Sequence, residues 1–208
     1  MLRALLGRPE VEEICELRGQ FGFMAIHGGN LERVTDVVAR EAAARAGASC
    51  YAVIQAAPLR HHVPSAMFDP AHSVMLASFL GHVDVVVAVH GYGRDDRFHQ
   101  LLLGGRNRGL AGHVAGHLRD GLPDVYDVLD QLAEIPEGLR GLHPDNPVNR
   151  PSLGGVQIEL PPTIRWNRDA KNWSDHLDTP RAPHVDLLID ALVAACLTWP
   201  LGPAHAAS

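Results

Sequence analysis

Cysteine is scarce in this sequence, and its three cysteines do not form a recognisable framework. Cys15, Cys50 and Cys196 lie far apart, are odd in number and include no C-x-x-C pair. This pattern argues against a disulfide scaffold and against a zinc site built from cysteines. Cys50 and Cys196 lie within apolar runs, so we expect both to be inert residues of the core.

Lysine is nearly absent, and positive charge is nowhere concentrated. Lys171 is the only lysine among 18 basic residues, and the formal net charge is -6. A nucleic-acid-binding protein carries a basic patch or stripe, so the composition argues against a nucleic-acid partner. We attribute the excess of arginine mainly to coding bias, although the guanidinium group is well suited to recognising carboxylates.

Long apolar runs are also lacking. No stretch approaches the roughly 18 consecutive apolar residues that a membrane-spanning helix needs. The opening segment, MLRALLGRP, is short and carries charge early, unlike a signal peptide. We therefore expect no membrane partner and a cytoplasmic protein.

The length and the apolar content suit one domain with a full core. The chain has 208 residues, of which 46% are hydrophobic and 20% are charged, and such values are ordinary for a globular protein. The sequence contains neither an internal repeat nor a linker that would divide it. We predict a single domain over residues 1–208, with 200–208 as a frayed tail.

Strand and helix patterns alternate along the chain, which is typical of the α/β class. Short apolar runs predict strands over 21–26, 48–55, 83–89, 101–103 and 156–160. Apolar residues at helical spacing predict helices over 31–46, 71–80, 107–120, 124–133 and 184–198. Loops are expected over 61–70, 134–155 and 166–182. The last loop contains Trp166 and Trp173, which we expect to fasten it to the core.

Two of the predicted strands end in a histidine followed by a glycine. His27 follows the run Phe21–Ile26, and His90 follows the run Val83–Val89. Ligands of open α/β sheets lie just beyond the carboxyl ends of the strands, so both imidazoles are expected at one edge. Glu32, five residues after His27 and at the start of the next predicted helix, adds a carboxylate.

Two histidines and one glutamate are a ligand set that catalytic zinc sites use. Gly28 and Gly29 allow the backbone to curl, so that His27 and Glu32 can reach one point. However, a histidine at the end of a strand is more often an ordinary polar residue, and Glu32 alone is an ordinary acid near a helix N-terminus. From spacing alone, two explanations are equally supported. Either His27, Glu32 and His90 form a metal site, or their arrangement is a coincidence.

Two other histidine pairs give weaker patterns. His61 and His62 are neighbours in an extended loop, where adjacent side chains point in opposite directions. His113 and His117 have the i, i+4 spacing of a helical metal pair but lack the glutamate of an H-E-x-x-H motif. We do not expect either pair to form the site.

Glu159 lies inside the apolar strand Val156–Leu160. Because side chains alternate along a strand, Gln157 and Glu159 are expected on the face opposite the aliphatic residues. A buried carboxylate needs a partner or has a raised pKa. Glu159 could act as an acid–base group beside a metal site or form an ion pair with an arginine such as Arg165, and the residues alone favour the ion pair.

Several motifs resemble, in the right order, the poly-γ-glutamate hydrolase family. The segment His27-Gly-Gly-Asn-Leu-Glu32 is similar to the H-G-G-G-I-E motif of that family, and His90-Gly91 resembles its second histidine. Asn149-Arg150 followed by Gly155-Val-Gln-Ile-Glu-Leu160 resembles its N-R-x-x-x-G-x-G-V-Q-L-E-L segment. The resemblance extends over residues 21–165, and the Gly-Val-Gln-Ile-Glu segment is its most specific part.

The resemblance implies a fold, a chemistry and a set of site residues. Such enzymes are similar in fold to zinc carboxypeptidases, which implies a three-layer α/β/α sandwich with a mixed, mainly parallel sheet. They cleave the γ-glutamyl amide bonds of poly-γ-glutamate. By this resemblance one zinc ion is bound by His27, Glu32 and His90, and Glu159 is the general base.

The resemblance also suggests substrate-binding residues, although the sequence departs from the family there. Asn149 and Arg150 are implied to lie near a substrate carboxylate, which the Arg150 guanidinium could bind through two parallel hydrogen bonds. Pro151 follows this pair where the family has a glycine-containing spacer, and Asn30 replaces the third glycine of the first motif. Arg94 is an addition at the expected mouth of the site. The resemblance therefore supports the metal chemistry of the family more strongly than it supports the family's substrate.

The sequence as a whole predicts a zinc-dependent hydrolase. Its substrate would contain a γ-glutamyl or related amide bond and carboxylate groups, in a small molecule or a polymer. One alternative is an amidohydrolase or carboxypeptidase that acts on another N-acyl amino acid or on a cell-wall peptide. Another is a non-catalytic metal-binding protein of the same fold. The sequence leaves open the oligomeric state and whether the loop 166–182 closes over the site.

Overall fold

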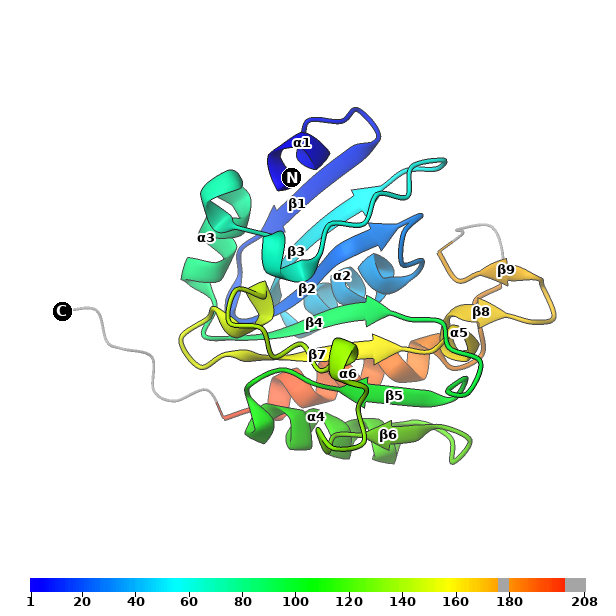
Figure 1. Ribbon diagram of the computed structural model, residues 1–208. Helices are drawn as coiled ribbons and strands as arrows, with labels where there is room; N and C mark the ends of the chain where they lie inside the picture. Colours follow the sequence, from blue (N-terminus) through cyan, green and yellow to red (C-terminus); the bar gives the residue numbers. More distant parts are fainter. Residues whose placement is uncertain (176–179, 201–208) are drawn as a thin grey trace.

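A seven-stranded mixed sheet forms the centre of the molecule (Figure 1). The computed structural model describes residues 1–175 and 180–200. The spatial order of the strands is β1-β3-β2-β4-β7-β5-β6. In chain order they are β1 (Val11–Glu16), β2 (Gly19–Gly29), β3 (Ala48–Gln55), β4 (Val85–Gly91), β5 (Gln100–Leu103), β6 (Asp127–Leu129) and β7 (Gly155–Leu160).

Helices cover both faces of the sheet. One face packs against α2 (Thr35–Ala46), α4 (Arg108–Gly121) and α6 (Val185–Thr198). The other face packs against α1 (Leu2–Leu6) and α3 (Val74–His82). Each interface is a separate cluster of buried apolar side chains, and their removal from water stabilises the layers. The predicted α/β/α sandwich with a mixed, mainly parallel sheet is therefore confirmed.

Short elements complete the described part of the chain. A short helix, α5 (Pro162–Arg165), leads into a hairpin of β8 (Trp166–Asn167) and β9 (Asn172–Trp173). The 3₁₀ turns are Ser65–Met67, Pro70–His72, Glu137–Leu139 and Pro147–Asn149. Within residues 1–175 and 180–200, no helix combines the length and the apolar character needed to span a membrane.

Four neighbouring strands run parallel and carry their carboxyl ends to one edge of the sheet. These strands are β3, β2, β4 and β7, and the antiparallel strands β1 and β5 flank them. The ends of β2, β4 and β7 are therefore neighbours, which is where α/β sheets place their ligands.

Burial on both faces explains the continuous apolar run of β4. Val85 and Val87 pack in the cluster under α2, whereas Val86 and Ala88 pack in the cluster under α3. A strand covered on both sides requires apolar residues at every position. The same alternation directs His90 to the face covered by α3.

An irregularity in β2 brings His27 to that same face. Ala25 packs on the α2 side and Ile26 on the α3 side, so strict alternation would return His27 to the α2 side. The register of β2 against β3 shifts between Ala25 and Gly28, and the ring of His27 instead contacts Phe68 on the α3 side. Such a bulge re-aims a side chain near the end of a strand.

The helix predicted over 31–46 begins later, at Thr35. The residues before it form a turn that contains Glu32. Val34, at the N-cap, has a φ of 80°, a left-handed conformation that interrupts the helical path and is rare for a β-branched residue. Glu32 therefore lies in the turn before the helix and not in its first turn.

The helix predicted over 124–133 is wrong. Residues 127–129 form β6, which pairs in parallel with β5 at the edge of the sheet. Val128 packs into the core. The short apolar run therefore pairs with β5 as a strand, although its spacing also fitted a helix. The strand β1 was not predicted, because its sequence VEEICE contains three acids and lies at the opposite edge.

The segment predicted as a loop over 166–182 contains the β8–β9 hairpin. Trp166 and Trp173 pair across this hairpin, with ring centroids 5.2 Å apart. Trp173 also packs against the main core, which agrees with the expectation that these rings fasten the segment. Residues 176–179, and 201–208 of the predicted frayed tail, lie outside the described residues.

Candidate active site

The three predicted metal ligands meet at the carboxyl edge of the sheet. His27 lies near the end of β2, Glu32 in the turn that follows, and His90 near the end of β4. One ligand atom from each residue lies within 4.8 Å of the other two. His27 and His90 are only 2% and 3% exposed, so this cluster lies below the surface.

Glu32 lies between the two imidazoles. Its Oε1 atom is 2.8 Å from Nδ1 of His27, and its Oε2 atom is 3.2 Å from Nδ1 of His90. Nε2 of His27 donates a hydrogen bond of 2.8 Å to the carbonyl oxygen of Val63, since a carbonyl can only accept. In the neutral imidazole, Nδ1 of His27 therefore carries a lone pair that faces a carboxylate oxygen.

This arrangement of acceptors fits a bound cation. A nitrogen lone pair and a carboxylate oxygen repel each other unless a proton or a metal ion lies between them. Imidazole nitrogen and carboxylate oxygen are ligands that zinc takes, and a zinc-binding histidine commonly donates its other N–H to a carbonyl, as His27 does. The residues present therefore fit a zinc ion.

Charges within the cluster shift the pKa values of its members. Burial acts to raise the pKa of Glu32, but His90 and His27 outweigh it and hold the pKa far below its usual value. Burial acts to lower the pKa of His90, but the Glu32 carboxylate outweighs it and raises the pKa. Glu32 is therefore ionised at neutral pH and can supply negative charge to a divalent cation.

Backbone contacts fix Glu32 in its turn. The N–H of Gly91 donates to Oε2 at 2.9 Å. The N–H of Glu32 donates to the carbonyl oxygen of His27 at 2.9 Å, and its own carbonyl oxygen accepts from Oγ1 of Thr35 at 2.7 Å. The carboxylate is thus positioned by the fold itself, which favours a preorganised site.

Gly29 makes the chain reversal after β2 possible. Its φ is +66°, and a Cβ atom at this position would lie 2.4 Å from the carbonyl oxygen of Gln55. Only glycine satisfies both conditions. The N–H of Gly29 donates to Oδ1 of Asp36 at 2.8 Å, and burial raises the pKa of this Asp36 carboxyl. Glycine in this turn therefore allows Glu32 to approach His27.

Glu159 lies beside the cluster on the neighbouring strand. Its Cα atom is in register with that of His90, and its side chain projects away from the aliphatic residues of β7, as the alternation predicts. Nε2 of Gln157 donates to its Oε1 atom at 2.8 Å. Burial raises the pKa of Glu159 to about 7; the Glu32 carboxylate adds to the increase, while His90 and Gln157 oppose it.

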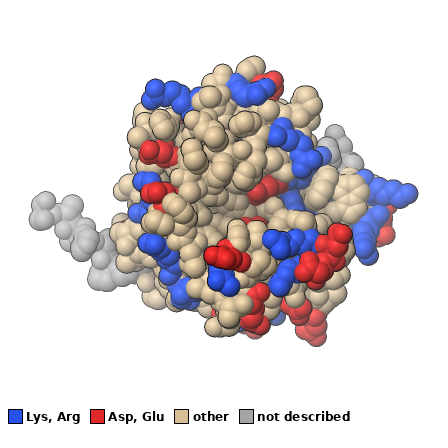
Figure 2. Space-filling model, viewed as in Figure 1, with Lys and Arg blue, Asp and Glu red and all other residues tan. Residues whose placement is uncertain are grey.

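A cavity of about 420 Å³ opens over Glu159 and the His27–Glu32–His90 cluster. Its walls include residues 62–66 and residues 137–143, which are far apart in the sequence. Figure 2 shows that this face of the molecule is hollowed near its centre and that acidic atoms are visible inside the hollow. The volume lies within the range of small-molecule sites.

His62 lines this cavity, whereas the sequence pattern did not predict the His61–His62 pair at the site. Its ring centroid is 4.8 Å from that of His27, and its side chain lines the cavity wall. Burial lowers the pKa of His62, and the neighbouring His27 lowers it further. The adjacent His61 instead donates its N–H to Gln55. From the sequence alone, the adjacent residues His61 and His62 could not be distinguished, so the pattern did not predict which of them faces the site.

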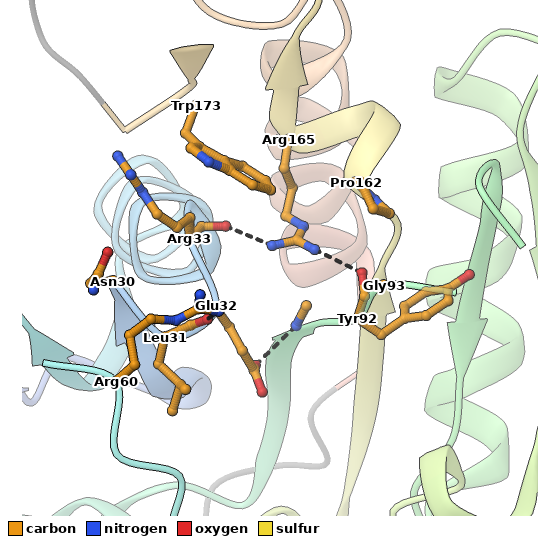
Figure 3. A pocket seen from close by; sticks show the side chains of 11 residues that line it. Asn30, Leu31, Glu32, Arg33, Arg60, Tyr92, Gly93, Pro162, Arg165 and Trp173 are labelled. Atoms are coloured by element: carbon orange, nitrogen blue, oxygen red, sulfur yellow. Dashed lines mark hydrogen bonds between the residues drawn. The ribbon is translucent and has the colours of Figure 1, made fainter. Parts of the chain in front are cut away.

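A second cavity of about 370 Å³ adjoins the first (Figure 3). The two cavities share Glu32, Gly91 and Tyr92 in their walls. Arg165 also lines the second cavity, and its terminal nitrogens donate to backbone oxygens. The described residues therefore contain no Glu159–Arg165 ion pair, which was the alternative explanation of Glu159 from the sequence.

Asn149 and Arg150 are not among the residues that line either cavity. Nδ2 of Asn149 donates to the carbonyl oxygens of Gly141 at 2.7 Å and His143 at 3.0 Å, so this amide holds a wall of the first cavity in place. Nη2 of Arg150 lies 3.2 Å from Oδ1 of Asp145. The contact of Asn149 and Arg150 with a substrate carboxylate stays a prediction.

The remaining candidates also lie away from the cluster. Arg94 is exposed and lines neither cavity, so its role at the mouth of the site stays a prediction. His113 and His117 contact the hydroxyl of Thr198 with Nε2 to Oγ1 distances of 3.2 and 2.8 Å. This pair joins α4 to α6 and does not belong to the candidate metal site.

The fold and the site define a class of protein: a three-layer α/β/α protein with a candidate metal site at the carboxyl edge of a mixed sheet. More narrowly, the chain belongs to the poly-gamma-glutamate hydrolase family, whose model matches residues 8–176. The curated proteins include one clear relative, the UPF0714 protein YndL of Bacillus subtilis (strain 168), which is 29% identical over 140 residues. The match covers 66% of this chain and 51% of YndL, so the chain spans about half the length of that relative.

Solved structures share the fold at low sequence identity. A bacteriophage poly-gamma-glutamate hydrolase superposes with a TM-score of 0.75 at 22% identity, over 89% of this chain and 87% of that chain. YndL in a zinc-free apo form gives a TM-score of 0.71 at 19% identity, over 89% of each chain. The N-formylglutamate amidohydrolase of Ralstonia eutropha JMP134 gives 0.56 at 12% identity, over 91% of this chain and 96% of that chain.

Proposed function

We propose that the protein is a zinc-dependent hydrolase that cleaves an amide bond in a γ-glutamyl or related carboxylate-bearing substrate. One observation carries the proposal: Glu159, a buried carboxyl with a pKa of about 7, shares a cavity with His27, Glu32 and His90. Membership of a hydrolase family supports hydrolysis. The description of a YndL structure as zinc-free supports zinc as the metal.

The three clustered residues would hold the ion. His27 and His90 would bind it through Nδ1, and Glu32 through its carboxylate. Zinc supplies Lewis acidity at such a site, which polarises a carbonyl group and makes water more acidic. The bond from His27 to Val63 fixes one of the two imidazoles in the tautomer that this role requires.

Glu159 would move the proton. Its carboxylate accepts a proton from the attacking water as the water oxygen bonds to the amide carbon. It then delivers this proton to the leaving nitrogen as the carbon–nitrogen bond breaks, which yields a carboxylic acid and an amine. The hydrogen bond from Gln157 engages Oε1 and leaves Oε2 for this exchange. A pKa of about 7 suits both the acceptance and the release of a proton.

The substitution Glu159→Gln tests the proposed base while leaving the metal ligands intact. We expect zinc content to be unchanged and turnover to fall about 100-fold or more, because the amide cannot accept the proton. The substitutions His27→Ala and His90→Ala should instead remove the zinc, as measured by elemental analysis of the purified protein. Full turnover by Glu159→Gln would exclude Glu159 as the base.

A substrate screen separates the proposal from its alternatives. It would compare poly-γ-glutamate, γ-glutamyl dipeptides, other N-acyl amino acids and cell-wall peptides with the zinc-loaded protein. Cleavage of the γ-glutamyl compounds supports the proposal. Cleavage confined to another N-acyl amino acid or to a cell-wall peptide indicates the amidohydrolase or carboxypeptidase alternative. Zinc binding without any hydrolysis indicates a non-catalytic metal-binding protein.

A further inference from the structure

A buried arginine faces the second cavity, and no described carboxylate is in ion-pair contact with it. Arg165 is 4% exposed, and although burial lowers its pKa to about 10, it stays charged at neutral pH. Its terminal nitrogens donate to the carbonyl oxygens of Arg33 and Tyr92, at 2.9 Å each, and Nε donates to that of Pro161 at 3.4 Å. Among the described residues, no carboxylate lies within ion-pair distance of it; the Glu32 and Glu159 carboxylates favour its charged form only from farther away. Burying a charge without an ion-pair partner costs free energy, and a counter-charge bound nearby offsets this cost.

The guanidinium of Arg165 keeps unused donors. Each terminal nitrogen carries two hydrogens and uses one of them in its bond to a carbonyl, so one N–H remains on Nη1 and one on Nη2. Figure 3 shows the guanidinium pointing into the cavity between Arg33 and Tyr92. A pair of N–H groups on the two terminal nitrogens matches the two oxygens of a carboxylate.

Contacts with its neighbours hold Arg165 in this position. Cζ lies 5.2 Å from the ring centroid of Trp173. A Cβ atom at Gly91 would lie 2.6 Å from Nη1 of Arg165, so the glycine leaves the space that the guanidinium occupies. A charged group that is already fixed loses little conformational freedom when it binds a ligand.

We infer that the second cavity binds a carboxylate group of the substrate, with Arg165 as its principal ligand and Arg60 at its rim. Arg60 lines the same cavity and is exposed, with one long contact of 3.5 Å to the carbonyl oxygen of Leu31. Arg33 has no part in this assignment, because it is bound to Asp175 through two hydrogen bonds of 2.7 Å.

The shared walls of the two cavities indicate how such a substrate would lie. Glu32, Gly91 and Tyr92 border both cavities, so one extended ligand can occupy them together. With an amide bond over Glu159, a neighbouring unit extends toward Arg165. A γ-linked glutamyl chain has a free α-carboxylate on each unit and would present one there. This inference rests on the proposed function.

A binding measurement that does not depend on turnover tests the site. A short γ-linked glutamate oligomer, and the same oligomer with carboxamides in place of its α-carboxylates, would be titrated calorimetrically into zinc-loaded Glu159→Gln protein. We expect the carboxylate form to bind about 10-fold or more tightly. Adding Arg165→Gln should abolish this preference, and adding Arg60→Gln should reduce it. Arg45→Gln, an exposed arginine of α2 paired with Glu41, is the control and should leave it unchanged.

The outcomes separate this site from the hydrolytic function. An Arg165→Gln protein that keeps the full preference, or a parent protein that has none, overturns the site even where γ-glutamyl amides are cleaved. A preference that depends on Arg165 in a protein that hydrolyses nothing keeps the site and removes the function. If Arg165→Gln does not fold, the same ratio is measured with Arg165→Lys, which keeps the charge but loses the paired donors, and with the exposed Arg60→Gln.

Discussion

The chemistry of the candidate site depends on which nitrogen of each histidine faces Glu32. The carbonyl of Val63 occupies Nε2 of His27, so its Nδ1 is the atom available to a metal. Nδ1 of His90 approaches the other carboxylate oxygen of Glu32. The two rings thus present equivalent atoms to one carboxylate, although neither spacing nor residue type in the sequence specifies a nitrogen.

The raised pKa of Glu159 predicts the acid side of a pH–activity profile. Only the ionised carboxylate can accept a proton, so kcat/KM should rise with pH until Glu159 is ionised. The pKa of about 7 is caused mainly by burial and refers to the site without a metal ion. A zinc cation nearby would lower this pKa, because it favours the charged form of the carboxyl. We therefore expect activity to rise about tenfold per pH unit up to a midpoint at or below 7.

The measurement is kcat/KM of the zinc-loaded protein from pH 5 to pH 9, with metal content verified at each pH because protonation of His27 and His90 also releases zinc. A profile that still rises steeply well above pH 7 would contradict the assignment. So would a Glu159→Gln protein whose residual activity keeps the same midpoint.

Residues with a motif around them were predictable, and residues without one were not. The proximity of His27, Glu32 and His90 was predicted because each lies at a defined position relative to a strand and its glycines, whereas only the family resemblance placed Glu159 beside them. Arg165 was noted only as a partner for Glu159. Its actual surroundings are backbone oxygens and a tryptophan ring, and such contacts leave no local pattern in a sequence.

At the scale of secondary-structure elements, the site depends on the irregular end of β2 and the turn after it. The register shift between Ala25 and Gly28 places His27 on the face of His90, and the turn through Val34 delays α2 so that Glu32 faces back toward the sheet. Alternation predicted the face of Glu159 correctly because β7 is regular. Alternation fails for His27, because the bulge before it reverses which face of the sheet the following side chains occupy.

Two glycines with the same backbone conformation provide a matched test of this turn. Gly29 and Gly47 both have a φ of +66°, but a Cβ at Gly29 would collide with Gln55, whereas a Cβ at Gly47 meets no atom of the described residues within 4 Å. Gly47→Ala should cost about 1–2 kcal/mol of unfolding free energy, which is the left-handed penalty alone. Gly29→Ala should cost about 1–3 kcal/mol more, because the backbone oxygen must move.

Chemical denaturation of both variants measures these free energies, and zinc content provides a second readout. Gly29→Ala should also weaken zinc binding, since the turn that carries Glu32 must shift, while Gly47→Ala should bind zinc as the parent does. Equal losses of stability in the two variants would show that the contact with Gln55 does not constrain the turn.

At the scale of the whole molecule, the two cavities depend on segments that are remote in sequence. The first is walled by residues 62–66 and 137–143 around the ends of three strands. The second shares Glu32 with the first and adds Arg60, Arg165 at the end of α5 and Trp173 of β9. The region over 166–182 therefore contributes Trp173 to a cavity wall as well as to the core.

Because the candidate ligands come from two strands and a turn, zinc binding at this site should stabilise the whole fold. An ion that binds only the folded state contributes about 4 kcal/mol when free zinc is about 1,000 times its Kd. For a chain of this size that corresponds to a rise in Tm of about 10 °C. Differential scanning calorimetry with zinc and with a chelator measures the difference, and His90→Ala should show none. Equal Tm values for the parent protein in both conditions would contradict the metal site.

The sequence by itself determined the α/β class and predicted that His27, Glu32 and His90 lie at one edge of the sheet and that Glu159 is buried, because periodicity and short motifs are local properties of a chain. Tertiary structure alone decided that residues 127–129 form a strand, that His62 and not His61 faces the site, and that Arg165 opens into a second cavity. Each of these depends on pairing, burial or contact between segments far apart in the sequence. Such contacts form only when the sheet assembles, and no local pattern encodes them.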